Sequence, residues 1–150
     1  MAVNRFSWHS QGADVKSLCI ILVLVCAATA QDPSNPIKTT VCTVSTSPQL
    51  YQAKLILVTG QLESDGTHGS MIIDRQCAGV GITFVSKHSF KGEDSLNAAL
   101  GHGRPGTLDK TITATFIGTF TWKPRGMPIR DLEIREVRDV AIVMKGFGQR

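Results

Sequence analysis

The sequence predicts a mainly β domain with five strands and one short helix between the third and fourth strands, placed after a cleaved signal peptide. Two observations support this prediction. Apolar and polar side chains alternate with period two over residues 110–122, which is typical of a β-strand. A continuous apolar run covers residues 18–30. That run is shorter than the about 20 residues that a membrane-spanning helix needs.

The composition is that of an ordinary globular protein, and it excludes several classes of function. Hydrophobic residues make up 42% of the 150 residues, and charged residues make up 19%. This length allows one domain and excludes a multidomain enzyme. The net charge is only +4 and no run of basic residues occurs, so we do not expect the protein to bind nucleic acid.

Residues 1–30 have the features of a secretory signal peptide. Basic residues precede the apolar run, and Ala28 and Ala30 supply the small side chains that signal peptidase reads, so we expect cleavage after Ala30. The alternatives are acylation at Cys26 and an uncleaved membrane anchor. No second apolar stretch follows in the sequence. We therefore expect an exported protein, periplasmic or extracellular, with no membrane span after cleavage.

Cysteine usage agrees with export. Cleavage leaves Cys42 and Cys77, which an oxidising compartment would join in one structural disulfide. The alternatives are two free buried thiols or a reactive thiol. Neither cysteine lies in a Cys-x-x-Cys pair, and no histidine lies within a few residues of either, so the sequence favours the disulfide.

The mature chain begins with an extended segment and continues into the first strands. Residues 31–45 form the predicted extended N-terminal segment, because they are mostly polar and contain two prolines. Residues 46–144 form the predicted barrel domain. Ser47 followed by Pro48 indicates the start of a short helix. We expect the first three strands at residues 54–62, 71–73 and 80–85.

Gly60 lies inside the first of these strands and indicates a bulge or a sharp bend. The turn between the first two strands contains Asp65-Gly66, which is a strong hairpin signal. Residues 93–100 then favour a helix, with acidic residues in the first turn and Gly101 as its stop. The predicted helix therefore separates the third strand from the fourth.

The last two strands close the domain. The fourth strand, residues 110–122, has threonines along one face and Gly118 in its interior. The fifth strand begins near Leu132. Its alternation of apolar and polar residues then changes phase, and a bulge near Glu136 explains this change. A helix over residues 132–144 is the alternative. We expect residues 145–150 to form a flexible tail.

This order of strands and helix resembles the OB-fold, a five-stranded, partly open Greek-key barrel. The resemblance covers residues 50–143 and rests on the element order together with Gly60 and Gly118. The chain is also similar to small exported bacterial proteins of unassigned function. The residues that carry this similarity are Tyr51-Gln52-Ala53-Lys54-Leu55, Gly60 with Glu63-Ser64-Asp65-Gly66, and Asp74 with Cys77 and Gly79. Those proteins usually have Tyr-x-Gly-Lys before the strand, and Ala53 replaces that glycine here. The similarity implies a fold and an exported location, and it implies no activity.

The resemblance to OB barrels also implies where a ligand binds, because such barrels bind polymers across the second and third strands and the adjoining loops. Single-stranded polymers are held by exposed aromatic side chains between basic residues. The candidate ligand surface in this sequence consists of Phe90 between Lys87 and Lys91, and Trp122 with Lys123 and Arg125.

Catalytic signals are weak. His68, His88 and His102 each lie in or beside a predicted loop, and none has the i, i+4 spacing of a metal-binding pair. The glycine-rich residues 101–106 are followed by neither the lysine nor the helix of a phosphate-binding loop. Asp65 is better explained by turn formation than by acid–base chemistry with Glu63. We therefore predict no catalytic residues, no metal and no cofactor.

The sequence analysis thus predicts an exported, non-catalytic binding module whose ligand is a glycan, a peptide or an envelope protein. Two alternatives belong to other classes. A small hydrolase would use His68, His102 and an acidic side chain gathered around an open pocket. A secreted inhibitor similar to netrin-like OB modules would use an N-terminal cysteine as its active element. Cys42, however, lies well inside the expected mature chain.

Overall fold

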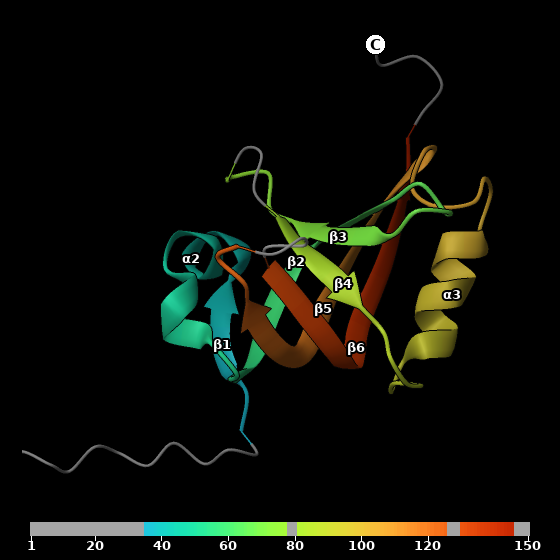
Figure 1. The fold of residues 1–150 in the computed structure, drawn as a ribbon. Helices are drawn as coiled ribbons and strands as arrows, with labels where there is room; N and C mark the ends of the chain where they lie inside the picture. The colour runs from blue at the N-terminus through green and yellow to red at the C-terminus, as the bar shows by residue number, and fades with distance from the viewer. Residues whose placement is uncertain (1–34, 78–80, 126–129, 146–150) are drawn as a thin grey trace, which may run out of the picture. The chain divides into compact units, whose positions relative to one another are not determined.

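The computed structural model describes residues 35–77, 81–125 and 130–145. The predicted signal peptide and most of the predicted tail lie outside these residues. The elements of the described chain appear in Figure 1. In chain order they are β1 (Ile37–Thr40), α2 (Val41–Thr46), the 3₁₀ turn η1 (Pro48–Tyr51), β2 (Leu55–Ser64), β3 (Ser70–Ile73), β4 (Gly81–Val85), α3 (Glu93–Gly101), β5 (Lys110–Trp122) and β6 (Arg130–Met144).

Five of the strands close into a barrel. Strands β2, β3 and β4 pair antiparallel in sequence order. Strand β4 runs parallel to β6, β6 pairs antiparallel with β5, and β5 returns antiparallel to β2. Strand β1 lies parallel to the first half of β2, outside this ring. The prediction of a mainly β, five-stranded barrel with a helix between its third and fourth strands is therefore confirmed.

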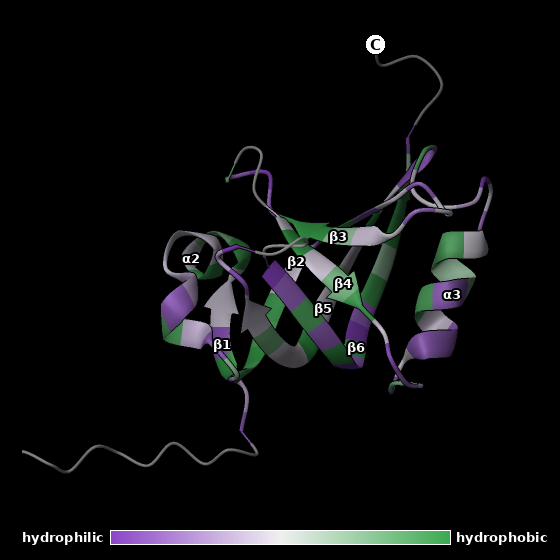
Figure 2. Ribbon diagram, viewed as in Figure 1, coloured by the Kyte–Doolittle hydropathy of each residue, from purple (hydrophilic) through white to green (hydrophobic). Residues whose placement is uncertain are grey.

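The barrel core follows from the alternation of side chains along the strands. Side chains that point inward are almost fully buried, whereas the threonines on the opposite face of β5 stay partly exposed. The core side chains of β2, β5 and β6 include Ile56, Val58, Leu62, Ile112, Phe116, Phe120, Leu132 and Ile134. Figure 2 shows hydrophobic and hydrophilic residues alternating along the first part of β6.

Strand β6 remains a strand through its change of alternation. Its register against β5 shifts between the partners of Ile117 and Gly118, which leaves Arg135 as an extra residue. This bulge lies one position from the predicted bulge near Glu136, and the alternative helix over residues 132–144 is wrong. A second shift follows at Asp139, whose φ of 55° is left-handed. Aspartate tolerates this conformation better than most residues.

The prediction of an extended segment over residues 31–45 is wrong for its last part. Residues 41–46 form α2, and Thr40 caps this helix by accepting a hydrogen bond from the Thr43 N–H at 3.0 Å. Val41 and Val44 lie one turn apart and are both fully buried. The segment is too short to show helical periodicity, and its burial against the barrel decides its structure.

Helix α3 is held by a buried lysine that the sequence analysis did not identify. Lys110 has no exposed surface, and its Nζ donates hydrogen bonds to the carbonyls of Leu100 at 3.0 Å, Arg104 at 2.7 Å, and His102. These carbonyls belong to the C-terminal end of α3 and the loop after it, where a positive charge is favourable. The first residue of β5 therefore fixes the end of α3 over the barrel.

Candidate functional site

An open groove of about 550 Å³ lies at the end of the barrel near the β2–β3 turn. Its floor includes Glu63, Met71 and Thr83, which are neighbours across β2, β3 and β4. All three have outward-facing positions, because the intervening Leu62, Ile72 and Ile82 are buried in the core. The groove thus lies over the second and third barrel strands and continues to the loop before β5, which contributes Thr107 and Leu108.

Met71 provides the apolar part of the groove floor because β4 begins with a glycine. A Cβ atom at Gly81 would collide with the sulfur of Met71, so the absence of a side chain lets Met71 lie flat across β4. Leu108 adds a second exposed apolar side chain on the opposite side. A thioether and a leucine together make a surface that adapts to varied apolar groups.

Charges of both signs surround these apolar side chains. Glu63 and Asp65 lie on the side of β2, whereas Arg75 and Lys145 line the groove elsewhere. The Nζ of Lys145 donates to the carbonyl of Thr107 at 3.1 Å, which holds this side chain at the rim. The groove therefore offers donors and acceptors as well as apolar contact, without a strong excess of either charge.

The β2–β3 turn at the groove is ordered by Asp65. Its Oδ1 accepts hydrogen bonds from the backbone N–H groups of Thr67 and His68, both at 2.8 Å. Its Oδ2 lies 2.7 Å from the Nδ1 of His68. The backbone N–H of His68, followed by that of Thr67, holds the pKa of the Asp65 carboxyl far below its usual value. The turn-forming role expected for Asp65 is the one that the structure has.

The His68–Asp65 pair lacks the geometry of a catalytic relay. The Thr67 hydroxyl lies 2.9 Å from the same Nδ1 atom that contacts Asp65. A relay needs the carboxylate on one ring nitrogen and the nucleophile on the other. His102 lies in the loop after α3 and does not line the groove. The structure therefore brings together two of the groups that the alternative hydrolase needs and separates the third.

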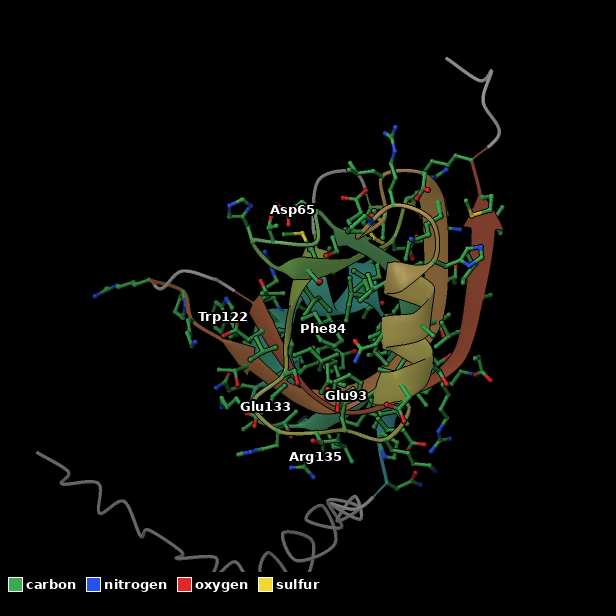
Figure 3. All side chains as sticks on the ribbon, turned by 90° about the vertical axis from the view of Figure 1, so that its right-hand side faces the viewer. Asp65, Phe84, Glu93, Trp122, Glu133 and Arg135 are labelled. Atoms are coloured by element: carbon green, nitrogen blue, oxygen red, sulfur yellow. A yellow bond between two sulfur atoms is a disulfide. The ribbon has the colours of Figure 1, made fainter. Side chains whose placement is uncertain are left out.

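The lysines of the predicted ligand surface are paired with acidic residues of β6. Lys87 contacts Glu133 at 2.7 Å, Lys91 contacts Glu136 at 2.9 Å, and Lys123 contacts Asp131 at 2.7 Å. Glu133 is labelled beside the barrel wall in Figure 3. Hydrogen bonding from Lys87 lowers the pKa of Glu133, which agrees with a close ion pair.

The two aromatic residues of that surface pack against the barrel. The ring of Phe90 contacts that of Phe84 edge to face, with centroids 5.8 Å apart. Trp122 is partly buried against the core, and its backbone N–H donates to Gln52 Oε1 at 2.7 Å. Arg125 is exposed. Binding at this surface stays a prediction, but it would use ring edges and paired lysines rather than free aromatic faces.

Cys42 of α2 and Cys77 after β3 form a disulfide, which confirms the predicted bridge. The Asp74 carboxylate lies with the two sulfurs in one cluster whose ligand atoms are within 4.8 Å of one another. A disulfide sulfur is not a thiolate and does not bind metal as one. The cluster therefore ties α2 to the β3–β4 connection.

Comparison of the chain with models of known protein families gave no match, and comparison with curated protein sequences gave none either. Within the described residues, no helix combines the length and the hydrophobicity that crossing a membrane requires. The sequence analysis missed the groove because its floor is assembled from three strands. A local signal for it was a methionine in one short strand that lies diagonal to a glycine in the next.

Proposed function

We propose that this chain is an exported, non-catalytic binding module of the OB-fold type, and that it binds an extended peptide segment of another envelope protein. The observation that carries the proposal is the groove over β2, β3 and β4 with Met71 across its floor. OB barrels use this face, formed by their second and third strands, to bind extended polymers.

The strand arrangement supports the OB-fold assignment. The order β2-β3-β4-β6-β5, the parallel pairing of β4 with β6 and the position of α3 between β4 and β5 agree with the five-stranded, partly open Greek-key barrel that the sequence resembles. The disulfide supports export, because such bridges persist mainly in oxidising compartments.

The groove lining favours a peptide over a glycan or a nucleic acid. No aromatic side chain of the described residues lines the groove, whereas bases in single-stranded polymers are commonly held by aromatic stacking. Met71 and Leu108 suit apolar side chains of varied shape, and the flanking charges of both signs suit a peptide with mixed charges. An extended peptide satisfies both requirements.

Binding is tested by selecting peptides from a displayed random library against the secreted protein. The affinities of the selected peptides are then measured for the parent protein and for the variants Met71→Lys and Leu50→Lys. We expect the Met71→Lys variant to lose about tenfold or more in affinity, because it places a charge on the apolar floor. Leu50→Lys changes an exposed leucine that does not line the groove and serves as the matched control. Failure to select any peptide, or equal affinities for all three proteins, would contradict the proposal.

Export is tested separately by intact-mass measurement of the protein secreted from a bacterial host. We expect a chain that starts at Gln31 and is two hydrogens lighter than the reduced mass. A chain that starts at Cys26 and carries added lipid would contradict the proposed processing. A cell-associated chain with its leader intact would contradict secretion.

A further inference from the structure

The outer edge of β6 is open beyond its contact with β4. Of the residues of β6, only Asp131, Leu132 and Glu133 pair with β4. The backbone N–H of Lys91 then donates to the carbonyl of Arg135, and the backbone carbonyl of Lys91 accepts from the N–H of Val137. From residue 138 to residue 144, no strand of the described chain lies on this edge. Figure 3 shows the upper part of β6 at the margin of the barrel.

This open edge is also apolar on both faces. Ile142 is 39% exposed, Val143 is 65% exposed and Met144 is 49% exposed. An open edge with several consecutive apolar residues is a template for pairing with another strand, and monomeric proteins usually protect such edges with charges, prolines or covering segments. Within the part of the chain that the structure describes, four successive residues, from Ala141 to Met144, carry no such protection.

The backbone bonding pattern shows which groups are available for pairing. The N–H of Lys145 donates to the carbonyl of Asp109 at 2.9 Å, and the register of β5 with β6 places these two residues opposite each other. Backbone groups of successive residues in an antiparallel strand point to alternate sides. Residues 141, 143 and 145 therefore bond to β5, and the N–H and C=O groups of Val140, Ile142 and Met144 point toward the open edge.

We propose that two copies of this chain associate by antiparallel pairing of their β6 edges about a two-fold axis at Ile142. In this register Ile142 faces Ile142 of the second copy, and Val140 faces Met144 of the second copy. Each of these residues directs its backbone groups outward, so the pairing extends the sheet from β5 through both β6 strands. The partner is a second copy because its edge has the same free groups and the same apolar residues.

Charge complementarity selects this register. Pairing about Ile142 brings Lys145, whose Nζ bonds the Thr107 carbonyl within the single chain, beside the left-handed bulge residue Asp139 of the second copy, and the two-fold axis repeats this approach of opposite charges on the other side. A two-fold axis at Ala141 would place Asp139 opposite Val143, and an axis at Val143 would place Lys145 opposite Ala141. Of these three registers, the one centred on Ile142 is the one that brings opposite charges close together across the strands, which is favourable in antiparallel sheets.

The first test measures the association of the full mature chain by sedimentation and light scattering from about 1 to about 100 µM. We expect a concentration-dependent dimer. Ile142→Lys should weaken it about tenfold or more, because two like charges then meet at the axis. Leu50→Lys changes another exposed apolar residue, 60% exposed and outside this edge, and should leave the dimer unchanged. A monomer throughout, or a dimer unaffected by Ile142→Lys, would overturn the proposal.

A second variant keeps the apolar side-chain character while blocking the edge. Ile142→Pro removes an N–H group that points outward and makes no bond to β5, so the barrel should keep its folded circular-dichroism spectrum. We expect this variant to be monomeric. A folded Ile142→Pro variant that still dimerises as the parent does would show that the association uses another surface and would overturn the proposal.

The register has its own test in the mixing of two variants. Asp139→Lys and Lys145→Glu should each weaken their own dimers, because each places like charges opposite each other twice. When the two variants are mixed, every such pair is of opposite charge, so we expect heterodimers about tenfold or more tighter than either homodimer. No gain on mixing would contradict the register centred on Ile142.

Discussion

Glu136 is held by two cations, and this arrangement predicts how the stability depends on pH. Arg138 donates to both of its carboxylate oxygens, at 2.7 and 2.8 Å, and Lys91 contacts it at 2.9 Å. The bonds from Arg138 first, and then from Lys91, lower the pKa of Glu136 from 4.5 to about 2. Because the folded-state pKa is depressed, this stabilisation is present above pH 4.5 and is lost as the pH falls toward 2.

We therefore expect Glu136→Gln to be less stable than the parent at neutral pH, and the difference to shrink between pH 4.5 and 2. Urea unfolding at a series of pH values measures this difference. Glu63→Gln changes an exposed carboxylate that forms no ion pair within the described chain, and it serves as the control. A difference between parent and Glu136→Gln that stays constant down to pH 2 would refute this role of Glu136.

Lys110 is the residue whose loss we expect to cost the most through unpaired polar groups. Lys110→Met keeps the length of the side chain but leaves three carbonyls at the end of α3 without their donor. We expect a loss of about 2 kcal/mol in the free energy of unfolding. Lys91→Met, which changes an exposed lysine, should cost less than about 1 kcal/mol. Equal costs in urea unfolding would show that the buried bonds contribute little.

The sequence identified the residues of the candidate ligand surface but not their environment. Lys87 and Lys91 look free in the sequence because their acidic partners lie more than forty positions away on β6. Phe90 looks free for a different reason, since Phe84 is close in the sequence but contacts it only because the chain turns back between β4 and α3. Pairings between distant strands decide whether a charge is neutralised, and local sequence patterns do not contain them.

Among the elements, α2 depends most on a covalent connection. It has six residues, and the disulfide joins it to Cys77, which is 35 positions away in the sequence. Replacing both cysteines by serine should lower the free energy of unfolding by about 3–4 kcal/mol, because the unfolded chain is no longer constrained. We also expect faster amide exchange in α2 than in β5. Unchanged stability of the double variant would show that burial of Val41 and Val44 alone holds the helix.

The secondary-structure elements were predicted correctly where a local sequence pattern continued over many residues. The prediction failed where packing against the barrel decided the structure. The alternation along β5 and the helix signals around α3 are local, and both elements form where they were expected. The strand assignment of β6 depended on recognising a bulge, which preserves pairing while it changes the period. The helix α2 has no local signal of comparable length, because its two valines acquire their role only against the barrel.

For the whole molecule, closure of the barrel requires close approach of β5 and β6 at Gly118. A Cβ atom there would collide with the carbonyl oxygen of Glu133 and would lie 3.0 Å from Leu132 Cγ. Gly118 also lies at the register shift that accommodates the extra residue Arg135. The glycine therefore lets β6 bend toward β4, with which it pairs to complete the ring.

Gly118→Ala should consequently lower the free energy of unfolding by about 2–3 kcal/mol, since the collision involves backbone that cannot move without disturbing the β5–β6 pairing. Gly101→Ala provides a control of opposite sign. A Cβ atom at Gly101 meets nothing within 4 Å, and alanine in a helix is favoured over glycine by about 0.5–1 kcal/mol. Urea unfolding of both variants separates the two effects. If Gly118→Ala were as stable as the parent, β5 and β6 would have room to separate, and barrel closure would not depend on this glycine.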